Sequence, residues 1–532
     1  MSAIGQDSLT TFDLSVSPPH VDVPRRYNAA VDIVERNVLQ GRGGKTAIID
    51  DAGQYTYAEL SERVNRCGNA LKNLGLQAEQ RVVMLQLDTV DFPSVFFGAI
   101  KAGLVAVPLN TLLITDDYRY MLSDSRAKAL VVSAALLPVV APILDELAHL
   151  DHVIVSGPAG DDGYPRLDDL IAAASADLEP ADTTRDDIAF WLYSSGSTGR
   201  PKGAAHLQSD LIYTAVYYGM GVLGVVEDDV VFSAAKLFFA YGLGNAMTFP
   251  LAVGATAVLM AERPTPDSVM KRLKEHEATI FYGVPTLFAG ILADRGIGRE
   301  NSSPRLKICV SAGEALPEEV AKRWSERFGV EIADGIGSTE MLHIFLSNRP
   351  GDIRYGSTGK PVPGYECRLL DDEGNEVADG EIGDLLVSGP SSAAFYWNNR
   401  EKSVQTFEGR WTRTGDKYLR DADGYYIYAG RSDDMLKVSG IWVSPFEVES
   451  ALMAHDAVLE AAVVGQEDEN DLVKPKAVIV LKDGQGSAAL VGELQQFVKD
   501  RLAPYKYPRW IEFAEDLPKT ATGKIQRFKL RG

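Results

Sequence analysis

The chain has 532 residues, 45% of them hydrophobic and 24% charged, and a formal net charge of −21. This length exceeds what a single hydrophobic core can hold, so we expect two to four domains. The acidic balance excludes a general binder of nucleic acid or of anionic membranes, but it leaves room for a local basic site. Cys67, Cys309 and Cys367 stand far apart and in no zinc-ligand spacing, which indicates buried thiols in a reducing, cytoplasmic location.

One segment, Leu237–Ala261, carries no charge and is long enough to span a bilayer. Glycine and proline residues interrupt it, which favours a loop, a buried helix and the strand Ala255–Met260 over a transmembrane helix. The N-terminal residues show no basic stretch followed by an apolar one, so no secretory signal and no contact with a membrane are predicted.

The first part of the chain alternates strand and helix patterns. After an N-terminal arm and a helix within residues 1–40, the strand Lys45–Asp50 is predicted, and a helix begins after Thr56. Further strands are predicted at 81–87, 105–108, 129–133 and 152–156, with helices between them. This alternation is typical of a parallel, doubly wound α/β sheet.

A loop of small polar residues follows the apolar run Ile188–Tyr193, which predicts a buried strand. Its members are Ser194, Ser195, Gly196, Ser197, Thr198, Gly199, Arg200, Pro201 and Lys202. Backbone N–H groups, hydroxyls and one lysine suit a polyphosphate. The loop lacks the G-x-x-x-x-G-K-[ST] spacing of the common nucleotide loop. The alternative is a flexible linker, although such linkers rarely follow directly from a buried strand.

The pattern continues with strands at 228–232, 279–282, 306–310 and 330–333, and with helices at 265–277 and 317–328. Two more loops rich in small residues follow strands, at Ser311–Glu314 and Asp334–Glu340. Ligands of open α/β sheets bind at the carboxyl ends of the strands, so three such loops predict one shared site.

From about Gly356 the sequence changes to short strands and glycine turns at 366–370, 372–375 and 383–387, which indicates a small β-barrel or ribbon that contains Thr414–Asp416. Residues 429–434 are typical of a hinge. Ser444, Pro445 and Glu447 then predict a helix start in a domain of about 100 residues. The chain ends near a basic loop, Pro518–Lys524.

The ordered motifs at 193–203, 311–316, 334–340, 414–416, 430–440 and 518–524 are similar to those of a known family. The sequence resembles the acyl- and aryl-CoA synthetases of the adenylate-forming superfamily, which includes luciferase, from about Tyr55 to Gln526. The amino-acid sequences of the segments Lys236–Asn245 and Ser338–Asn348 are most similar to those of benzoate–CoA ligases.

The resemblance implies a large α/β domain, residues 1–430, with two doubly wound sheets and a small β-barrel subdomain. A hinge at 431–434 and a small mobile α+β domain at 435–532 would follow. It also implies a ligase with two steps. A small aromatic carboxylate attacks the α-phosphate of ATP, in the presence of Mg²⁺, to give acyl-AMP and pyrophosphate. Coenzyme A then displaces AMP.

By this resemblance the loop 194–202 would hold the β- and γ-phosphates, with Lys202 as a counter-charge. Thr339 would contact the α-phosphate, and Glu340 would bind Mg²⁺, which prefers oxygen ligands. Asp416 would accept the ribose hydroxyls, with Arg431 nearby. Two segments would surround the adenine and complete the nucleotide site: Gly313, Glu314 and Ala315, and Asp334, Gly335, Ile336 and Gly337.

Each of these roles has a purely structural alternative. Lys202 would then be a solvated surface lysine, and Glu340 a loop acid at a helix N-terminus. Asp416 and Arg431 would form a surface ion pair.

Lys524 would bridge the acyl carboxylate and the α-phosphate in the first transition state, where such a donor is worth about 10²–10³-fold in rate. Its alternative is an ordinary C-terminal lysine. Acylation of Lys524 by an acyltransferase would remove its charge. Rotation about Asp433 would replace the Lys524 loop with the loop 437–442. There Lys437 would act electrostatically in the second step, while Gly440 and Trp442 would line the tunnel for coenzyme A.

The acyl pocket would be lined by Phe239, Ala240, Tyr241, Gly313, His343 and Ile344. Relatives that activate amino acids carry an Asp where Ala240 and Tyr241 stand, so an amino-acid substrate is disfavoured. The bulk of Tyr241 and His343 favours a compact aryl acid such as benzoate, although His343 could instead be a core histidine.

Other acids remain as alternatives: hydroxybenzoate, aminobenzoate, furoate and medium-chain fatty acids. A luciferase-like oxygenase is less favoured, and a non-catalytic member would lack Lys524 or Glu340. A homodimer is compatible with the sequence, as is a monomer.

Overall fold

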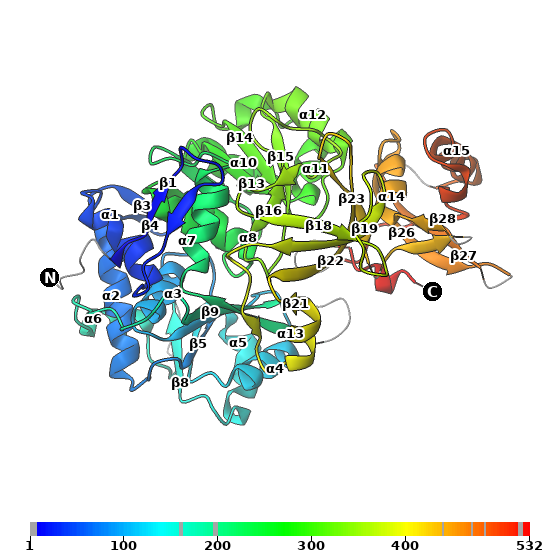
Figure 1. The fold of residues 1–532 in the computed structure, drawn as a ribbon. Helices are drawn as coiled ribbons and strands as arrows, with labels where there is room; N and C mark the ends of the chain where they lie inside the picture. The colour runs from blue at the N-terminus through cyan, green and yellow to red at the C-terminus, as the bar shows by residue number, and fades with distance from the viewer. Residues whose placement is uncertain are drawn as a thin grey trace.

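The computed structural model describes residues 8–158, 163–194, 200–432, 434–438, 441–469, 472–482, 486–519 and 525–531. Figure 1 shows a broad N-terminal part, coloured blue to yellow, and a smaller orange and red part that extends from one end of it. Within the broad part, β5, β8 and β9 lie in the lower half and β13–β16 in the upper half. The strands β18, β19 and β22 lie between these and the smaller part.

A mixed seven-stranded sheet forms the lower layer of the large part. Its spatial order is β20 (Phe395–Tyr396), β10 (Lys202–Leu207), β9 (Ile188–Ser194), β6 (Val105–Pro108), β5 (Arg81–Leu85), β7 (Ala129–Ser133) and β8 (His152–Ser156). The pairings from β9 to β8 are parallel, which confirms the alternation expected from the sequence. β10 and β20 add antiparallel strands, and neither is predicted by the sequence pattern.

Helices α2 (Tyr57–Asn73) and α3 (Asp91–Lys101) pack against each other over this sheet. Thr56 caps α2 as predicted: its hydroxyl accepts the N–H of Glu59, whose carboxylate accepts the N–H of Thr56. The two helices approach closely because glycines meet at their crossing. A Cβ atom on Gly68 would lie 2.8 Å from the carbonyl oxygen of Gly98.

A mixed nine-stranded sheet forms the second layer. Its spatial order is β17 (Lys360–Pro361), β16 (Ile344–Ser347), β15 (Ile332–Gly337), β14 (Ile308–Ser311), β13 (Ile280–Gly283), β11 (Val230–Ser233), β12 (Thr256–Val258), β3 (Thr46–Asp50) and β4 (Gly53–Thr56). The strands from β15 to β3 are parallel, and the others pair antiparallel at the edges.

Two expectations need correction here. β3, which the sequence pattern groups with the alternating strands of the first part of the chain, joins the second sheet through β12, because strand order in a sheet is a tertiary property that no local pattern encodes. Residues 334–337, expected as loop, belong to β15, because Gly335–Gly337 pair with β16 in a hairpin. The helix α12 (Glu318–Phe328) and the capped helix α10 (Pro266–Glu275) lie where they were predicted.

The uncharged segment 237–261 folds as the sequence pattern predicts. It contains α8 (Ala240–Leu243), a π-helical stretch at 244–248, α9 (Phe249–Val253) and β12. Across the described part of the chain, no helix is long and apolar enough to cross a membrane.

The predicted barrel or ribbon is an antiparallel five-stranded sheet. Its strands are β18 (Glu366–Leu370), β19 (Ile382–Ser388), β22 (Trp411–Arg420), β21 (Phe407–Glu408) and β23 (Tyr426–Arg431). The strand predicted at 372–375 is wrong: residues 372–374 form a turn, because Asp371 accepts the N–H groups of Glu373 and Asn375. One continuous apolar core joins this subdomain to both large sheets, since it includes Tyr418 and Tyr426 as well as strands of each sheet.

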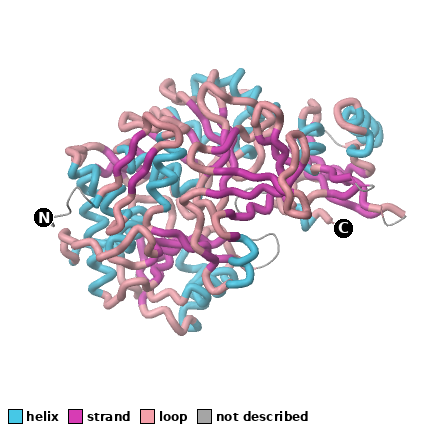
Figure 2. Tube along the Cα trace, in the orientation of Figure 1, coloured by secondary structure: helices cyan, strands magenta, loops and turns pink. Residues whose placement is uncertain are grey.

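The C-terminal part has a hydrophobic core of its own. Its elements are β24 (Leu436–Val438), β25 (Ile441–Val443), α14 (Pro445–Met453), β26 (Val458–Glu467), β27 (Val473–Leu481), α15 (Ala488–Lys499) and β28 (Trp510–Phe513). Figure 2 shows its helices against a small group of strands. Ser444 caps α14, with Pro445 at the first helical position, as predicted. The domain boundary near residue 430 stays a prediction.

The loop between β11 and α8 is tied to the first sheet by Asp88, which lies just after β5. Both carboxylate oxygens of the buried Asp88 accept the N–H of Leu237, at 3.3 and 3.2 Å. Lys236 donates to the carbonyls of Met260 and Glu262. Burial raises the pKa of Asp88 to about 6, although the nearby Lys236 cation opposes this rise.

This buried carboxyl gives a pH-dependent prediction. The pKa of Asp88 is 3.8 in the unfolded chain and about 6 in the folded chain, so the folded state holds the carboxyl proton more tightly. The stability that this protonation contributes is complete below pH 3.8 and is lost as the pH rises through 6. Asp88→Asn removes this titration. We expect the difference in free energy of unfolding between the Asp88→Asn variant and wild type to rise by about 1.4 kcal/mol, in favour of the variant, between about pH 5 and about pH 7.5.

Denaturant unfolding at the two pH values measures this difference. Asp228→Asn, at an exposed position, serves as the control. An Asp88→Asn effect of the same size at both pH values would contradict the prediction.

Candidate functional site

Some of the predicted site residues lie outside the described part of the chain. They are Ser195, Gly196, Ser197, Thr198 and Gly199 of the phosphate loop, together with Asp433, Gly440 and Lys524. Lys437 and Trp442 face each other across the β24–β25 pair by their backbones. The remaining predicted residues can be placed.

The carboxylate of Glu340 is the meeting point of three elements. Oε1 of Glu340 accepts the phenol O–H of Tyr396, at 2.7 Å, and the hydroxyl of Ser194, at 3.2 Å. Ser194 ends β9, Tyr396 belongs to β20, and Glu340 lies in the turn between β15 and β16. No helix begins at Glu340 in this turn, so the helix-terminus alternative for this residue is wrong.

Lys202 lies beside this carboxylate, at the first position of β10. Its Nζ lies 4.7 Å from the centre of the Tyr396 ring, where the face of the ring attracts a cation. Burial lowers the pKa of Lys202, the negative charge of Glu340 opposes this, and Lys402 and Arg431 add to the lowering. Lys202 is therefore half-buried within the predicted site, rather than a solvated surface lysine.

The backbone around Glu340 is held at three successive carbonyls. The Thr339 carbonyl faces Nε2 of His206 at 2.7 Å. The Glu340 carbonyl accepts the N–H of Ala393, and the Met341 carbonyl accepts the hydroxyl of Ser391. His206 belongs to β10, and Ser391 and Ala393 lie just before β20. The turn is therefore held by the antiparallel edge of the first sheet and the segment that leads into it.

The second acidic group, Asp334, is buried in β15 and has an oxygen, Oδ1, without a partner among the described residues. Burial raises its pKa well above the ordinary value, although the N–H groups of Leu316 and Gly335 oppose this. Ser311, the last residue of β14, pairs with Asp334, and Gly313 follows two residues later with a φ of +93° that favours glycine. Glu314 and Ala315 are half-buried beside it.

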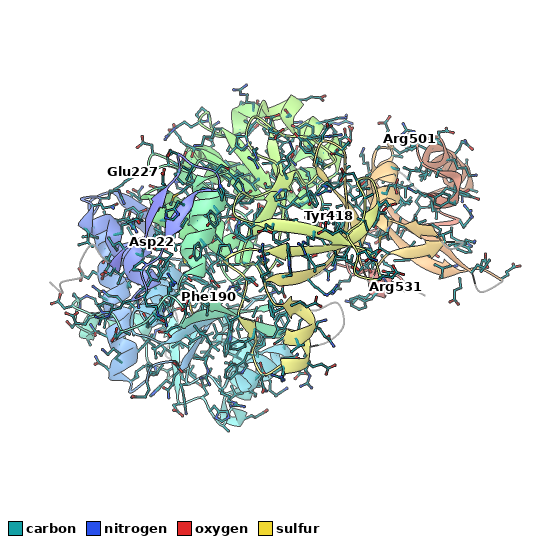
Figure 3. All side chains as sticks on the ribbon, in the orientation of Figure 1. Asp22, Phe190, Glu227, Tyr418, Arg501 and Arg531 are labelled. Atoms are coloured by element: carbon teal, nitrogen blue, oxygen red, sulfur yellow. The ribbon has the colours of Figure 1, made fainter. Side chains whose placement is uncertain are left out.

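Asp416 and Arg431 pair across β22 and β23. A guanidinium nitrogen of Arg431 donates to Asp416 Oδ1 and to the Thr414 carbonyl, each at 3.1 Å. Asp416 is buried, so this is not a surface ion pair. Burial raises the pKa of Tyr418 well above its ordinary value, and the charges of Asp416 and Asp334 raise it further. Figure 3 shows Tyr418 within the strands that face the C-terminal part.

The predicted acyl residues also come together. The Tyr241 hydroxyl donates to the Val310 carbonyl at 3.1 Å, and the rings of Tyr241 and His343 lie 5.7 Å apart. Nε2 of His343 faces the Tyr241 carbonyl, at 3.2 Å, and Oδ1 of Asn245, at 3.1 Å. Burial lowers the pKa of His343 to about 3, so its ring is neutral at physiological pH.

His343 fits closely against α8 and the π-helical stretch after it. A Cβ atom on Gly244 would lie 2.3 Å from the His343 ring. Phe239 and Ala240, at the start of α8, are half-buried, and Ile344 begins β16. His343 is buried like a core histidine, but its hydrogen bonding is incomplete, because Nδ1 has no partner among the described residues.

The segment after the predicted hinge is joined to the C-terminal end by ion pairs. Arg527 donates to both oxygens of Glu449, at 3.0 and 2.8 Å, and its guanidinium lies 3.7 Å from Asp434. Arg531 also pairs with Asp434. Figure 3 shows Arg531 close to the strands of the large domain. Asp434, which follows position 433, is thus bound to two arginines that follow position 524.

Three residues of this arrangement were not predicted: Tyr396, His206 and Asp210. Tyr396 stands in the run Phe395–Trp397, which is typical of a buried core. His206 is a lone histidine in an apolar stretch, and such residues are usually structural. The spacing of four residues between His206 and Asp210 is a weak sequence signal for this pair, because two side chains at that spacing can meet in a turn, as these do.

Family models match both parts of the chain. Residues 34–397 match the AMP-binding enzyme model, and residues 447–524 match the model of the AMP-binding enzyme C-terminal domain. The two matches lie on either side of the predicted hinge.

Full-length relatives are also similar. The chain is 63% identical over 527 residues to a benzoate–CoA ligase of Thauera aromatica, which covers 98% of this chain and 99% of the relative. It is 53% identical over 509 residues to a 4-hydroxybenzoate–CoA/benzoate–CoA ligase of Rhodopseudomonas palustris, which covers 95% and 94% of the two chains.

A solved structure of a benzoate CoA ligase from Burkholderia xenovorans LB400 superposes with a TM-score of 0.89 and 56% identity. It covers 95% of this chain and all of that one, at 100%. Sequence and fold therefore agree from end to end: the chain belongs to the family of AMP-binding enzymes.

Proposed function

We propose that this protein is an ATP-dependent benzoate–CoA ligase. The observation that carries the proposal is the identity of 63% to the Thauera benzoate–CoA ligase over almost the whole length of both chains. Benzoate and ATP would form benzoyl-AMP and pyrophosphate, and the thiolate of coenzyme A would then attack the acyl carbonyl and release AMP. Another small aryl acid is the main alternative, because the Rhodopseudomonas relative is named for 4-hydroxybenzoate as well as benzoate.

The acyl residues support an acid with an uncharged ring. Phe239, Tyr241 and Ile344 are apolar or neutral, and the pKa of about 3 leaves His343 neutral. No cation among these residues would pair with a second carboxylate, and no anion would pair with an amino group. A compact aromatic acid matches these properties better than an amino acid does.

In the first step the chain would hold the nucleotide through residues of four strands and one turn. Ser194 and Lys202 would face the β- and γ-phosphates, and Thr339 the α-phosphate. The Asp416 carboxylate would accept the ribose hydroxyls and release Arg431 toward the phosphates. Ser194 and the Thr339 carbonyl already have hydrogen-bond partners before ATP arrives, which limits the reorganisation needed on the phosphate side as charge develops.

Glu340 fits the role of a magnesium ligand. Its Oε1 accepts two hydroxyls, and no residue of the described ranges donates to Oε2. The described part of the chain contains no cluster of three or more metal-binding side chains. Mg²⁺ usually binds through one or two carboxylates together with substrate phosphates and water, which a single Glu340 can provide. When bound, Mg²⁺ would neutralise the charge of the leaving pyrophosphate.

The C-terminal domain would serve both steps in turn. Lys524 would stabilise the first transition state, and acylation of its amine would remove that cation. Rotation about Asp433 would then bring in Lys437, Gly440 and Trp442 for the attack by coenzyme A. The pairs of Asp434 with Arg527 and Arg531 support this proposal, because they link the segment at the hinge to the segment that carries Lys524.

The first prediction concerns the acid. We expect benzoate to exceed hexanoate in kcat/KM by at least about tenfold, because a flexible chain leaves part of a rigid aromatic pocket unfilled. Coupled detection of AMP with benzoate, 4-hydroxybenzoate, 2-aminobenzoate and hexanoate measures this. A tenfold preference for hexanoate would overturn the aryl assignment, and release of AMP that does not need coenzyme A would favour an oxygenase-like reaction.

The second prediction concerns Lys524. Lys524→Ala should lower benzoate-dependent exchange of pyrophosphate into ATP by about 10²–10³-fold, while thioester formation from supplied benzoyl-AMP stays near wild type. Lys529→Ala, which removes another lysine of the same C-terminal segment, is the matched control. Equal loss in both steps would contradict the two-step role of the C-terminal domain.

The third prediction concerns Tyr396. Tyr396→Phe removes one of the two hydroxyls that orient Glu340, so calorimetry should show binding of Mg·ATP weakened by about tenfold. Tyr27→Phe is a matched control, since Tyr27 is a buried tyrosine that donates to the carboxylate of Asp32 at 2.9 Å, in the N-terminal part of the chain. An unchanged affinity in Tyr396→Phe would show that Glu340 does not need this bond.

A further inference from the structure

A buried histidine and aspartate pair lies behind the nucleotide-binding turn. His206 is the fifth residue of β10, and Asp210 begins α7 (Asp210–Thr214). Their side chains are 0% and 1% exposed. Nδ1 of His206 lies 2.8 Å from Oδ2 of Asp210, and Nε2 lies 2.7 Å from the Thr339 carbonyl oxygen. The ring stacks on Phe190, with centroids 5.2 Å apart and planes at 16°.

The partners of the ring determine where its protons lie. A carbonyl oxygen only accepts, so Nε2 of His206 carries a proton and donates it to Thr339. Nδ1 faces a carboxylate oxygen, and their contact needs a second proton between them. The pair then has no net charge, which suits its complete burial. The N–H of Leu207 also donates to Oδ2 of Asp210, at 3.0 Å, and holds that oxygen in place.

This pair acts on the turn that carries two of the predicted nucleotide contacts. Thr339 is the acceptor, and Glu340 follows it directly. The strand that carries His206 begins at Lys202, so β10 connects the phosphate loop to the Thr339 turn. Ala393 and Ser391 hold the next two carbonyls. His206 is thus the first of three consecutive anchors of this turn.

We infer that His206, oriented by Asp210 and Phe190, is a positioning residue for the adenylation step. Its Nε2–H fixes the Thr339 carbonyl and thereby the placement of the Thr339 hydroxyl and the Glu340 carboxylate toward the phosphates of ATP. This inference rests on the proposed ligase activity. A purely structural pair would instead support the fold and affect both steps of the reaction alike.

Two substitutions of His206 separate the two bonds of the ring. In His206→Gln the side-chain amide reaches as far as Nε2, so a donor to the Thr339 carbonyl is kept. In His206→Asn the amide reaches only as far as Nδ1, so Asp210 keeps a partner and Thr339 loses its donor. The two variants are alike in chemistry and differ in which contact they retain.

We expect His206→Asn to lower kcat of benzoate-dependent pyrophosphate exchange by about 10–100-fold with KM for ATP changed less than about threefold, because misplaced groups act mainly on the transition state. His206→Gln should stay within about fivefold of wild type. Thioester formation from supplied benzoyl-AMP should change less than about threefold in both variants. Thermal unfolding of each variant is measured alongside.

Glu35→Gln is the matched stability control, because Glu35 forms a buried ion pair with Lys101 that the site does not use. If His206→Asn does not fold, His206→Met replaces it, since the thioether fills the space of the ring but donates no proton. Equal rates in the Asn and Gln variants, a parallel loss of both steps, or failure of both the Asn and Met variants to fold would overturn the inference. Absence of pyrophosphate exchange in wild type with any aryl acid would overturn the proposed function, and this inference with it.

Discussion

The arrangement of the site depends on one constraint: the Glu340 turn is held from outside its own sheet. Glu340 belongs to the hairpin between β15 and β16 of the second sheet, yet its carboxylate is bonded by Ser194 and Tyr396 of the first sheet. The carbonyls of Thr339 and Glu340 also have partners outside the second sheet, His206 of β10 and the N–H of Ala393 just before β20. The two sheets can therefore form the proposed nucleotide site only together, because neither supplies both the acid and its supports.

Burial controls the charges around this junction. The protein is strongly acidic, yet burial and the nearby cations Lys402 and Arg431 lower the pKa of Lys202, and only the negative charge of Glu340 opposes this lowering. Two predicted site acids, Asp334 in β15 and Asp416 in β22, are also buried. Water is largely excluded there, so fixed charges and dipoles act more strongly than they would at the surface. The acyl side contains neutral groups instead, which separates the charged and the uncharged halves of the proposed substrates.

Much of the fold could be predicted from local patterns. The strands at 105–108, 129–133 and 152–156, and the helix starts at Thr56 and Ser444, agree with the structure. These features depend on side chains within a few residues of one another. The membership of β3 in the second sheet depends instead on a partner far away in the chain. β10 pairs with the neighbouring β9 and was missed because the residues around Lys202 carry no local strand signal.

The sequence by itself determined which groups are available: a phosphate-type loop at 194–202, the acids Glu340 and Asp416, and an uncharged set of acyl residues. These follow from residue type and order, which identify the family. Only the tertiary structure decided what holds those groups. Tyr396, His206 and Asp210 carry no motif, because a supporting hydrogen bond requires only a donor at the right point in space. Such a point is set by the packing of two sheets, and residues 56 to 146 positions apart in the chain meet there.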